Sequence, residues 1–598
     1  MKTTSHTTRA PRLVAASVLS LFVALLPAAP ALAQGTGFGE RGEGRQTTRP
    51  APRPANTQGR GPRATATSAA AYQRPRLVLL IAVDQFRYDF LERFDELFVA
   101  GGLKRLQREG ASWTNANYDH VPTETAPGHA TMLTGAWPAE TGIIGNDWYD
   151  RTAKKTVLNV GDAGVRLFGG GATEVAASPR NLLASTLGDE LRLTTAGRSK
   201  VIGVSGKDRG AILPAGRAAN AAYWYSPFTG EMISSSYYFA QLPEWVTRFN
   251  AARPADKYFG KSWERMLPAA EYEERAGEDA PAWETETPRL TKAFPHVVTG
   301  GGTAPSAAFY GDLRYSPFSN DIIVSFAEQA LVNENLGADA DTDVLTVSLS
   351  ANDYVGHQWG PYSHEAMDAT LHTDRQIAAL LDMVERRVGL RHTLVAFTAD
   401  HGVAPVPEHA TAMKLGGGRV KPADVTSAVR GALRARFGEE ADKYLLAFDN
   451  NNLYFDHQAL RRERVGHEEV ERLAGEAALA VPGIARFFTR TQLAARGVSP
   501  ADPVARRVLH GFHAARSGDV VVVQEPFKYL VEYQIVATHG APYSYDTHVP
   551  VILMGPGLTA GRYAAAATPA DIAPTLAALL RMQPPSNSVG RVLSEALR

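Results

Sequence analysis

The chain of 598 residues contains no cysteine. Disulfides, thiolate metal ligands and cysteine nucleophiles are therefore excluded, as is the cysteine that sulfatases convert to formylglycine. A chain of this length buries enough apolar surface to fold without disulfides. Any metal ion that it binds must be held by oxygen atoms and imidazole nitrogens.

Net charge is also absent. The 62 Lys and Arg residues equal the 62 Asp and Glu residues, so the overall charge does not favour nucleic acid or an anionic surface as a partner. With 44% hydrophobic and 21% charged residues, the composition is typical of a soluble globular protein. We find no sequence repeat.

The N-terminus lacks an apolar run long enough to span a bilayer comfortably, which needs about 20 residues. Two arginines precede the apolar run 13–26, and a small-x-small site at 31–33 follows it. This pattern predicts a secretory signal, residues 1–33, cleaved before Gln34. A retained anchor is the alternative, and the lack of an Arg-Arg pair favours the general secretory route over the twin-arginine route. We expect an exported protein, in a bacterial periplasm or the medium, whose mature chain has no transmembrane segment.

Residues 34–73 are rich in Gly, Arg, Pro and Thr and have almost no large apolar residues, which predicts a disordered linker. From residue 74 onward, apolar segments alternate with helical patterns. Strand signals occur in the segments 76–84, 200–210, 343–357, 392–402 and 549–557. Helices are predicted at 320–337, with Asn320 as the cap, and at 568–580, where Thr568, Pro569 and Asp571 form the helix entry.

Strands separated by helices imply a mostly parallel sheet covered on both faces, an α/β fold. Two stretches are less regular. About 211–318 is rich in Tyr, Trp, Ser and Pro, which indicates an insertion over the site. About 403–530 contains short helices and strands and is predicted to be a smaller α/β subdomain.

Side chains of the metal-ligand type follow several predicted strands: Asp84, Asp353, His357, Asp400, His401 and His539. Ligands of open α/β sheets bind at the carboxyl ends of strands, so we expect these residues to meet. Three aspartates and three histidines suit a pair of divalent cations. Carboxylate oxygens together with imidazole nitrogens, with no sulfur available, favour zinc, with manganese and iron as alternatives. Each short motif alone is weak evidence. His129 and His548 are close to ligand positions in the sequence and are candidates for outer hydrogen-bonding groups.

The order Asp84, Thr125, Asp353-x-x-x-His357, Asp400-His401 and His539 resembles the alkaline phosphatase superfamily. Within it, "PTETAPGHATMLTGAWPAETGIIGN" resembles the nucleophile segment of the type I phosphodiesterase/nucleotide pyrophosphatase group. That group has a threonine before Pro-x-His and an asparagine 21 residues later, here Thr125 and Asn146. The segment "SGKDRGA" places Lys207 and Arg209 after a strand, similar to secreted bacterial alkaline phosphatases with a threonine nucleophile and a Lys-x-Arg pair. The resemblance covers about 74–598 and implies a three-layer α/β/α fold for this catalytic domain.

The resemblance also implies roles for these residues. One metal ion would be held by Asp353, His357 and His539. The other would be held by Asp84, Asp400, His401 and the Thr125 oxygen, and both ions would be Zn²⁺. Thr125 would be the nucleophile, and Asn146, Lys207 and Arg209 would bind the phosphoryl group.

A threonine hydroxyl is a poor nucleophile because it stays protonated at ordinary pH. A bound metal ion lowers the pKa of a coordinated oxygen, to about 7 for zinc-bound water, and the β-branch of Thr125 restricts its χ1 angle. Attack by Thr125 on phosphorus predicts a phosphothreonine intermediate. Asn146 offers an amide donor, Lys207 and Arg209 offer positive charge, and a helix that begins near Pro127 would add its N-terminal dipole.

The two positively charged side chains beside the phosphoryl group, Lys207 and Arg209, suit the dianionic phosphoryl group of a monoester. We therefore predict an alkaline phosphatase whose partners are small-molecule phosphate esters, without nucleic acid binding beyond nucleotide substrates. A phosphodiesterase or nucleotide pyrophosphatase with the same metal ions is the main alternative, and the Tyr- and Trp-rich segment 221–230 could supply its nucleoside slot. A metal-bearing but inactive binding protein is a second alternative. A sulfatase is disfavoured because the nucleophile position has neither cysteine nor a Ser-x-Pro-x-Arg stretch.

Overall fold

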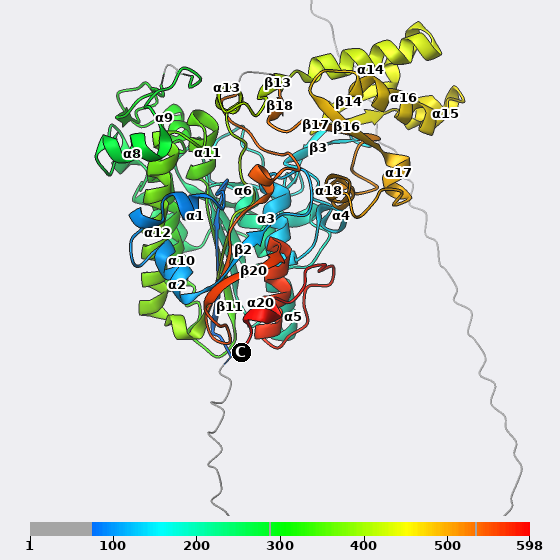
Figure 1. Ribbon diagram of the computed structural model, residues 1–598. Helices are drawn as coiled ribbons and strands as arrows, with labels where there is room; N and C mark the ends of the chain where they lie inside the picture. The colour runs from blue at the N-terminus through cyan, green and yellow to red at the C-terminus, as the bar shows by residue number, and fades with distance from the viewer. Residues whose placement is uncertain (1–73, 286–288, 533–534) are drawn as a thin grey trace, which may run out of the picture. The chain divides into compact units, whose positions relative to one another are not determined.

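The computed structural model describes residues 74–285, 289–532 and 535–598, so the predicted signal and linker lie outside the described residues. Within these ranges, ten strands form one mixed sheet (Figure 1). In spatial order they are β20 (Gly561–Ala567), β2 (Ala111–Ala116), β19 (Val551–Met554), β12 (Thr393–Thr398), β1 (Leu77–Val83), β11 (Asp343–Leu349), β6 (Val201–Ser205), β7 (Ala221–Tyr225), β8 (Met232–Ser235) and β5 (Leu167–Phe168).

The centre of this sheet is parallel. β12, β1, β11, β6 and β7 all pair in the same direction, so their carboxyl ends lie at one edge. β19 runs antiparallel to both of its neighbours, β12 and β2. The amino end of β19 therefore lies at the same edge, and the segment that leads into it can add residues to a site there.

The apolar run of β1 is continuous because both faces of the strand are buried. Successive side chains of a strand point to opposite faces. Leu77, Leu79, Ile81 and Val83 belong to a core with residues of α10 (Phe318–Asn333) and α12 (His364–Arg387). Val78, Leu80 and Ala82 belong to a second core with residues of α3 (Thr125–Thr134), α5 (Leu187–Thr194) and α20 (Ile572–Leu579). Figure 1 shows these two helix layers on opposite sides of the sheet, which confirms the three-layer α/β/α fold.

Two predicted strand segments change structure part-way. Of 343–357, only the part up to Leu349 is strand, and α11 (Ala351–Trp359) follows. Asp353 and His357 are therefore one helical turn apart and lie on the same face of α11. Of 200–210, only Val201–Ser205 is strand, and α6 (Asp208–Ala215) begins three residues later.

The helix entries also differ in detail from the expectation. Asn320 lies inside α10 rather than at its cap, and its Oδ1 accepts a hydrogen bond from the backbone N–H of Ala351 at 3.0 Å. The predicted helix entry is present in part: the backbone N–H of Thr568 donates to Asp571 Oδ2 at 3.0 Å, and a short 3₁₀ turn, Pro569–Asp571, precedes α20.

A four-stranded sheet lies outside the central one, in the yellow and orange part of Figure 1. It contains β14 (Leu445–Asp449), β15 (Asn452–Phe455), β17 (Val520–Gln524) and β16 (Ile484–Thr489), and it shares a core with α14 (Pro422–Phe437) and α16 (His467–Leu479). Asp519 accepts hydrogen bonds from Arg151 at 2.9 Å, from His457 at 2.7 Å and from the backbone of Phe455 at 2.7 Å. It thereby ties the small sheet to the segment that follows β3 (Asp147–Asp150).

The other irregular stretch, 211–318, includes β7 and β8, which are strands of the central sheet. The tyrosines and the tryptophan of β7 are at most 3% exposed, so they are core residues and do not form an open nucleoside slot. Among the described residues, no helix combines the length and apolarity needed to cross a membrane.

Candidate active site

Thr125 is the first residue of α3, and Glu124 occupies the cap position before it. The helix therefore begins two residues before Pro127, the position expected from the sequence. Thr125 is 1% exposed. The start of α3 lies against the end of β12 because Gly128 lacks a side chain: a Cβ there would lie 2.2 Å from the backbone oxygen of Asp400.

The aspartates and histidines that follow the strands come together as predicted. Asp84, Asp400 and His401 form one group, and Asp353, His401 and His539 form another. Within each group, the possible ligand atoms all lie within 4.8 Å of one another. His357 adjoins the second group, with its Nε2 3.2 Å from Asp353 Oδ1. All six predicted metal-ligand side chains therefore meet at the sheet edge, and His401 lies within reach of both groups.

The three histidines are oriented alike. In each ring Nδ1 is paired with a backbone carbonyl oxygen: that of Ala537 for His357 at 2.7 Å, Gly402 for His401 at 2.8 Å and Thr123 for His539 at 2.8 Å. A proton on Nδ1 leaves the Nε2 lone pair directed toward the aspartates. This is the usual arrangement of a metal-ligating histidine, whose second nitrogen is hydrogen-bonded.

Two buried atoms in this group make no hydrogen bond, Asp84 Oδ1 and His401 Nε2. The neighbouring oxygens have charged or polar neighbours instead: Asp84 Oδ2 lies 2.6 Å from Lys207 Nζ and Asp400 Oδ2 lies 3.2 Å from His129 Nδ1. Buried polar atoms are normally satisfied, so each exception calls for an explanation. A divalent cation with oxygen and nitrogen ligands would satisfy both unpaired atoms. The residues present therefore fit the predicted metal ions.

Lys207 lies among the carboxylates. Its Nζ is 2.6 Å from Asp84 Oδ2, 2.6 Å from Asp353 Oδ2 and 3.3 Å from the Thr125 hydroxyl. The lysine occupies the position before the first residue of α6, and its Nζ also lies 5.1 Å from the centre of the Tyr354 ring. The predicted substrate-binding lysine thus lies close to Thr125, the predicted nucleophile, and pairs with two of the predicted metal ligands.

The pKa values reflect this crowding. Burial and the neighbouring Asp353 and Asp400 raise the pKa of Asp84 well above its usual value. Burial opposes ionisation of Asp353 too, but Lys207 and His357 outweigh it and hold the pKa of Asp353 well below its usual value. Burial lowers the pKa of His539, and neighbouring histidines lower it further, so this imidazole is neutral and able to act as a ligand.

The side-chain carbonyl oxygen of Asn146 holds this residue beside Thr125, the predicted nucleophile. Its Oδ1 accepts the backbone N–H of Ala126 at 3.0 Å, so its amide NH₂ group remains available to a substrate. Its backbone N–H donates to Glu124 Oε2 at 2.7 Å. Burial raises the pKa of Glu124 to about 7.

Arg209 lies in the first turn of α6, in the cleft that also contains Asn146 and Lys207. This cleft has a volume of about 690 Å³. Arg209 Nε is buried without a hydrogen-bond partner, and the nearest carboxylate, that of Asp208, is 3.6 Å from a terminal nitrogen. The guanidinium is therefore able to bind an anion that enters the cleft.

Two further side chains hydrogen-bond to the predicted ligands. His129, a predicted outer group, has Nδ1 3.2 Å from Asp400 Oδ2 and Nε2 2.8 Å from Ser348 Oγ. Gln85 was not predicted from the sequence: its backbone N–H donates to Asp400 at 3.0 Å, and its Nε2 donates to Asp353 at 2.9 Å. Its position directly after Asp84 in the sequence is the signal that could have identified it as a neighbour of the predicted metal ligands. His548, the other predicted outer group, instead stacks on Tyr88.

Residues 78–542 match the family described as "Type I phosphodiesterase / nucleotide pyrophosphatase". The chain belongs to this family. It is 36% identical over 533 residues to "Alkaline phosphatase PhoV" of Synechococcus elongatus, covering 88% of this chain and 93% of the relative. It is 35% identical over 530 residues to "Alkaline phosphatase PafA" of Elizabethkingia meningoseptica, covering 88% and 95%. The crystal structure of wild-type PafA superposes with a TM-score of 0.82 at 34% identity, over 88% of this chain and 100% of that one.

Proposed function

We propose that the protein is an alkaline phosphatase that hydrolyses phosphate monoesters through a phosphothreonine on Thr125. The observation that carries the proposal is the position of Thr125, at a helix start with Lys207 3.3 Å from its hydroxyl, beside the six gathered ligand residues. Two relatives that align with this chain over 93% and 95% of their own length are named alkaline phosphatases, which supports the same reaction.

The proposed metal ions are two Zn²⁺. Their ligands would be Asp353, His357 and His539 for one ion, and Asp84, Asp400, His401 and Thr125 for the other, with His401 also near the first group. When bound, they would supply positive charge that lowers the pKa of an oxygen and neutralises the phosphoryl group.

In the proposed reaction, Oγ1 of Thr125 loses its proton and forms a bond to phosphorus as the alcohol leaves and takes up a proton. Water then hydrolyses the phosphothreonine, which releases phosphate and restores the hydroxyl. The N-terminal dipole of α3 points at the phosphoryl group. Asn146 donates from its amide, and Lys207 and Arg209 balance the second negative charge of a monoester.

The proposal is tested by comparing the rates on 4-nitrophenyl phosphate and bis(4-nitrophenyl) phosphate. A monoesterase hydrolyses the first much faster, whereas a higher rate on the diester would identify a phosphodiesterase. Metal analysis of the purified protein checks for zinc. Thr125→Ser should retain some turnover and Thr125→Ala should lose nearly all of it. An unchanged Thr125→Ala variant would contradict the nucleophile assignment.

We also propose that the protein is exported, because residues 1–33 have the pattern of a secretory signal. Mass spectrometry of the mature protein should find Gln34 at its N-terminus. An intact N-terminus on the mature protein would contradict cleavage at this site.

A further inference from the structure

The tip of the β14–β15 hairpin extends from the small four-stranded sheet to the active-site cleft. The hairpin turns through two residues, Asn450 and Asn451, between the paired residues Asp449 and Asn452. Both turn residues have positive φ angles, 44° and 61°, which asparagine adopts more readily than most other residues. Asn450 also lines the active-site cleft. This turn therefore brings a side chain of the small sheet to the cleft that contains the predicted substrate-binding residues.

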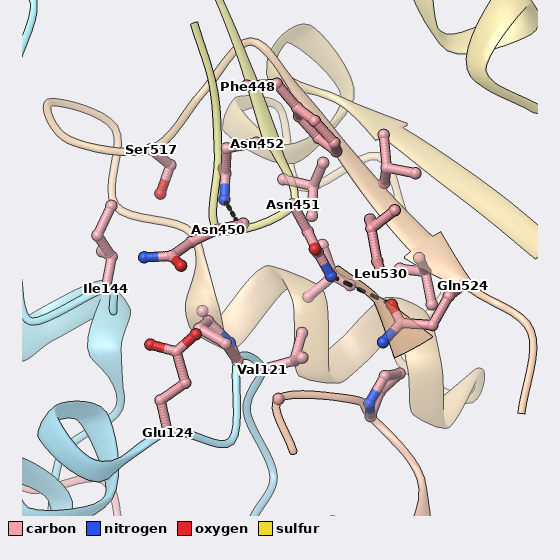
Figure 2. Close-up of a pocket in the computed structure, with 18 of the residues that line it drawn as sticks. Val121, Glu124, Ile144, Phe448, Asn450, Asn451, Asn452, Ser517, Gln524 and Leu530 are labelled. Atoms are coloured by element: carbon pink, nitrogen blue, oxygen red, sulfur yellow. Dashed lines mark hydrogen bonds between the residues drawn. The ribbon is translucent and has the colours of Figure 1, made fainter. Parts of the chain in front are cut away.

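The two asparagines of the turn point in different directions (Figure 2). The side chain of Asn450 lies on the side of Ile144 and Glu124, whereas that of Asn451 lies on the side of Gln524. Asn451 Nδ2 donates to Gln524 Oε1 at 3.1 Å, so its contact stays within the small sheet. Asn450 is the member of this pair that reaches toward the segment of the predicted nucleophile.

Asn450 holds the residue that directly follows Asn146. Its Nδ2 donates to the carbonyl oxygen of Asp147 at 2.6 Å and to Asp147 Oδ1 at 2.8 Å. A second contact lies beside this one, in which Thr156 Oγ1 donates to Asp449 Oδ2 at 3.0 Å. Thr156 belongs to the strand that pairs with β3, whose first residue is Asp147. The hairpin tip is therefore fixed to both strands of this pair.

The approach of Asn450 is close enough to restrict the residue on the other side of Asn146. A Cβ at Gly145 would lie 2.8 Å from Asn450 Nδ2 and 2.8 Å from the carbonyl oxygen of Asp147. The absence of a side chain at Gly145 thus permits the contact. Asn450 packs directly against the segment 145–147, which has Asn146 at its centre.

The nucleophile segment holds Asn146 as well. The backbone N–H of Asn146 donates to Glu124 Oε2 at 2.7 Å, and its Oδ1 accepts the backbone N–H of Ala126 at 3.0 Å. The direction of its amide group relative to Thr125 therefore depends on contacts from the nucleophile segment and, through Asp147, from the small sheet. A displacement of about 1 Å in such a group can lower a rate about 100-fold.

We propose that Asn450 is a positioning residue, which fixes the segment 145–147 so that the amide of Asn146 meets the phosphoryl group. This inference rests on the proposed function, in which Asn146 donates to the phosphoryl group. It adds a role for the small four-stranded sheet, whose hairpin tip completes the phosphoryl site. Asn450 acts through Asn146 and does not contact the reacting atoms.

The first test is Asn450→Gly. Glycine adopts the positive φ angle of this position without strain, so the turn is kept while the carboxamide is removed. The kcat/KM for 4-nitrophenyl phosphate should fall about tenfold, and that for methyl phosphate by the same factor, because both esters present the same phosphoryl group. A loss confined to 4-nitrophenyl phosphate would show that Asn450 contacts the leaving group, and it would overturn the proposal. Asn451→Gly, in the same turn, is the matched control and should change either value by less than about twofold.

The second test repeats Asn450→Gly in an Asn146→Ala background. If Asn450 acts through Asn146, the substitution should lower kcat/KM by less than about twofold there, since coupled residues are not additive. A general loss of structure would give the same loss in both backgrounds and would overturn the proposal, as would an unchanged rate in the single Asn450→Gly variant.

A further variant covers the case in which Asn450→Gly folds poorly. Asp147→Ala leaves the β14–β15 hairpin intact and removes one of the two acceptors of Asn450, so it should lower kcat/KM about threefold with Asn146 present and not in its absence. Equal losses in the two backgrounds would overturn the proposal. An Asn146→Ala variant with wild-type activity would instead contradict the role of Asn146 in the proposed function.

Discussion

Replacing Lys207 by methionine should destabilise the metal-free protein far more than the metal-loaded protein. The lysine lies 2.6 Å from both Asp84 and Asp353, and all three side chains are at most 4% exposed. Methionine has a similar length but no charge, so the two buried carboxylates lose their cation. Removing one partner of a buried ion pair costs about 3–5 kcal/mol of unfolding free energy.

The size of the protein sets the expected shift in melting temperature. An unfolding entropy of about 2.1 cal/mol/K per residue gives about 1 kcal/mol/K for a folded unit of about 500 residues. The metal-free Lys207→Met variant should therefore melt about 3–5 °C below the metal-free wild type. Added zinc should narrow the difference, since metal ions would then neutralise the same carboxylates.

The measurement is differential scanning calorimetry of chelator-treated and zinc-reloaded protein. Lys155→Met is a suitable control, because Lys155 is an exposed residue of β4 (Lys155–Leu158) and its loss should not change the melting temperature. If the metal-free Lys207→Met variant had the same melting temperature as the metal-free wild type, Lys207 would not be the cation that balances Asp84 and Asp353. An equal loss with and without zinc would also refute the reasoning.

Three further substitutions test other parts of the structure. Gln85→Leu removes a hydrogen bond to Asp353 and should weaken zinc binding about 10–100-fold in a competition titration with a chelator; unchanged affinity would contradict this supporting role. Gly145→Ala would place a Cβ 2.8 Å from Asn450 Nδ2 and force a shift on Asn146, the proposed phosphate-binding asparagine. The monoesterase kcat/KM should therefore fall about 10–100-fold, whereas a wild-type value would show that the loop tolerates the methyl group. Burial would raise the pKa of Asp519, but its histidine and arginine partners outweigh burial and lower it, so its stabilising effect is complete above about pH 4 and is lost as the pH falls further. Urea unfolding should therefore show Asp519→Asn less stable than the wild type at pH 7, with a smaller difference near pH 3, and a difference independent of pH would argue against the ionised state.

Much of the central architecture could be predicted from local patterns. The run at β1 is apolar at every position because both faces of the strand are covered, and Asp84 follows it at the sheet edge. The fold class and the meeting of the six ligand-type residues followed from such strand ends. His539 depended on more than local pattern, because it reaches the edge only through the antiparallel direction of β19.

Contacts between distant segments could not be predicted in the same way. Asn450 Nδ2 donates to the carbonyl oxygen of Asp147 at 2.6 Å, although the two residues are 303 positions apart. No periodicity or motif in the sequence predicts that the tip of the β14–β15 hairpin contacts Asp147. The position of Lys207 between two carboxylates likewise depends on the packing of α6 against the sheet, whereas its presence in the site could be expected from the Lys-x-Arg pair.

The place of β19 in the sheet has a consequence for the order in which the chain can be completed. β2 and β20 join the remaining strands only through β19, whose residues 551–554 are synthesised more than 400 positions after β2. On a growing chain, β2 therefore has neither of its final neighbours, and its backbone donors and acceptors stay open until the last part of the protein emerges. The same late stretch of chain brings His539, so the sheet can close and the predicted metal-ligand set can be completed only after this stretch has been synthesised.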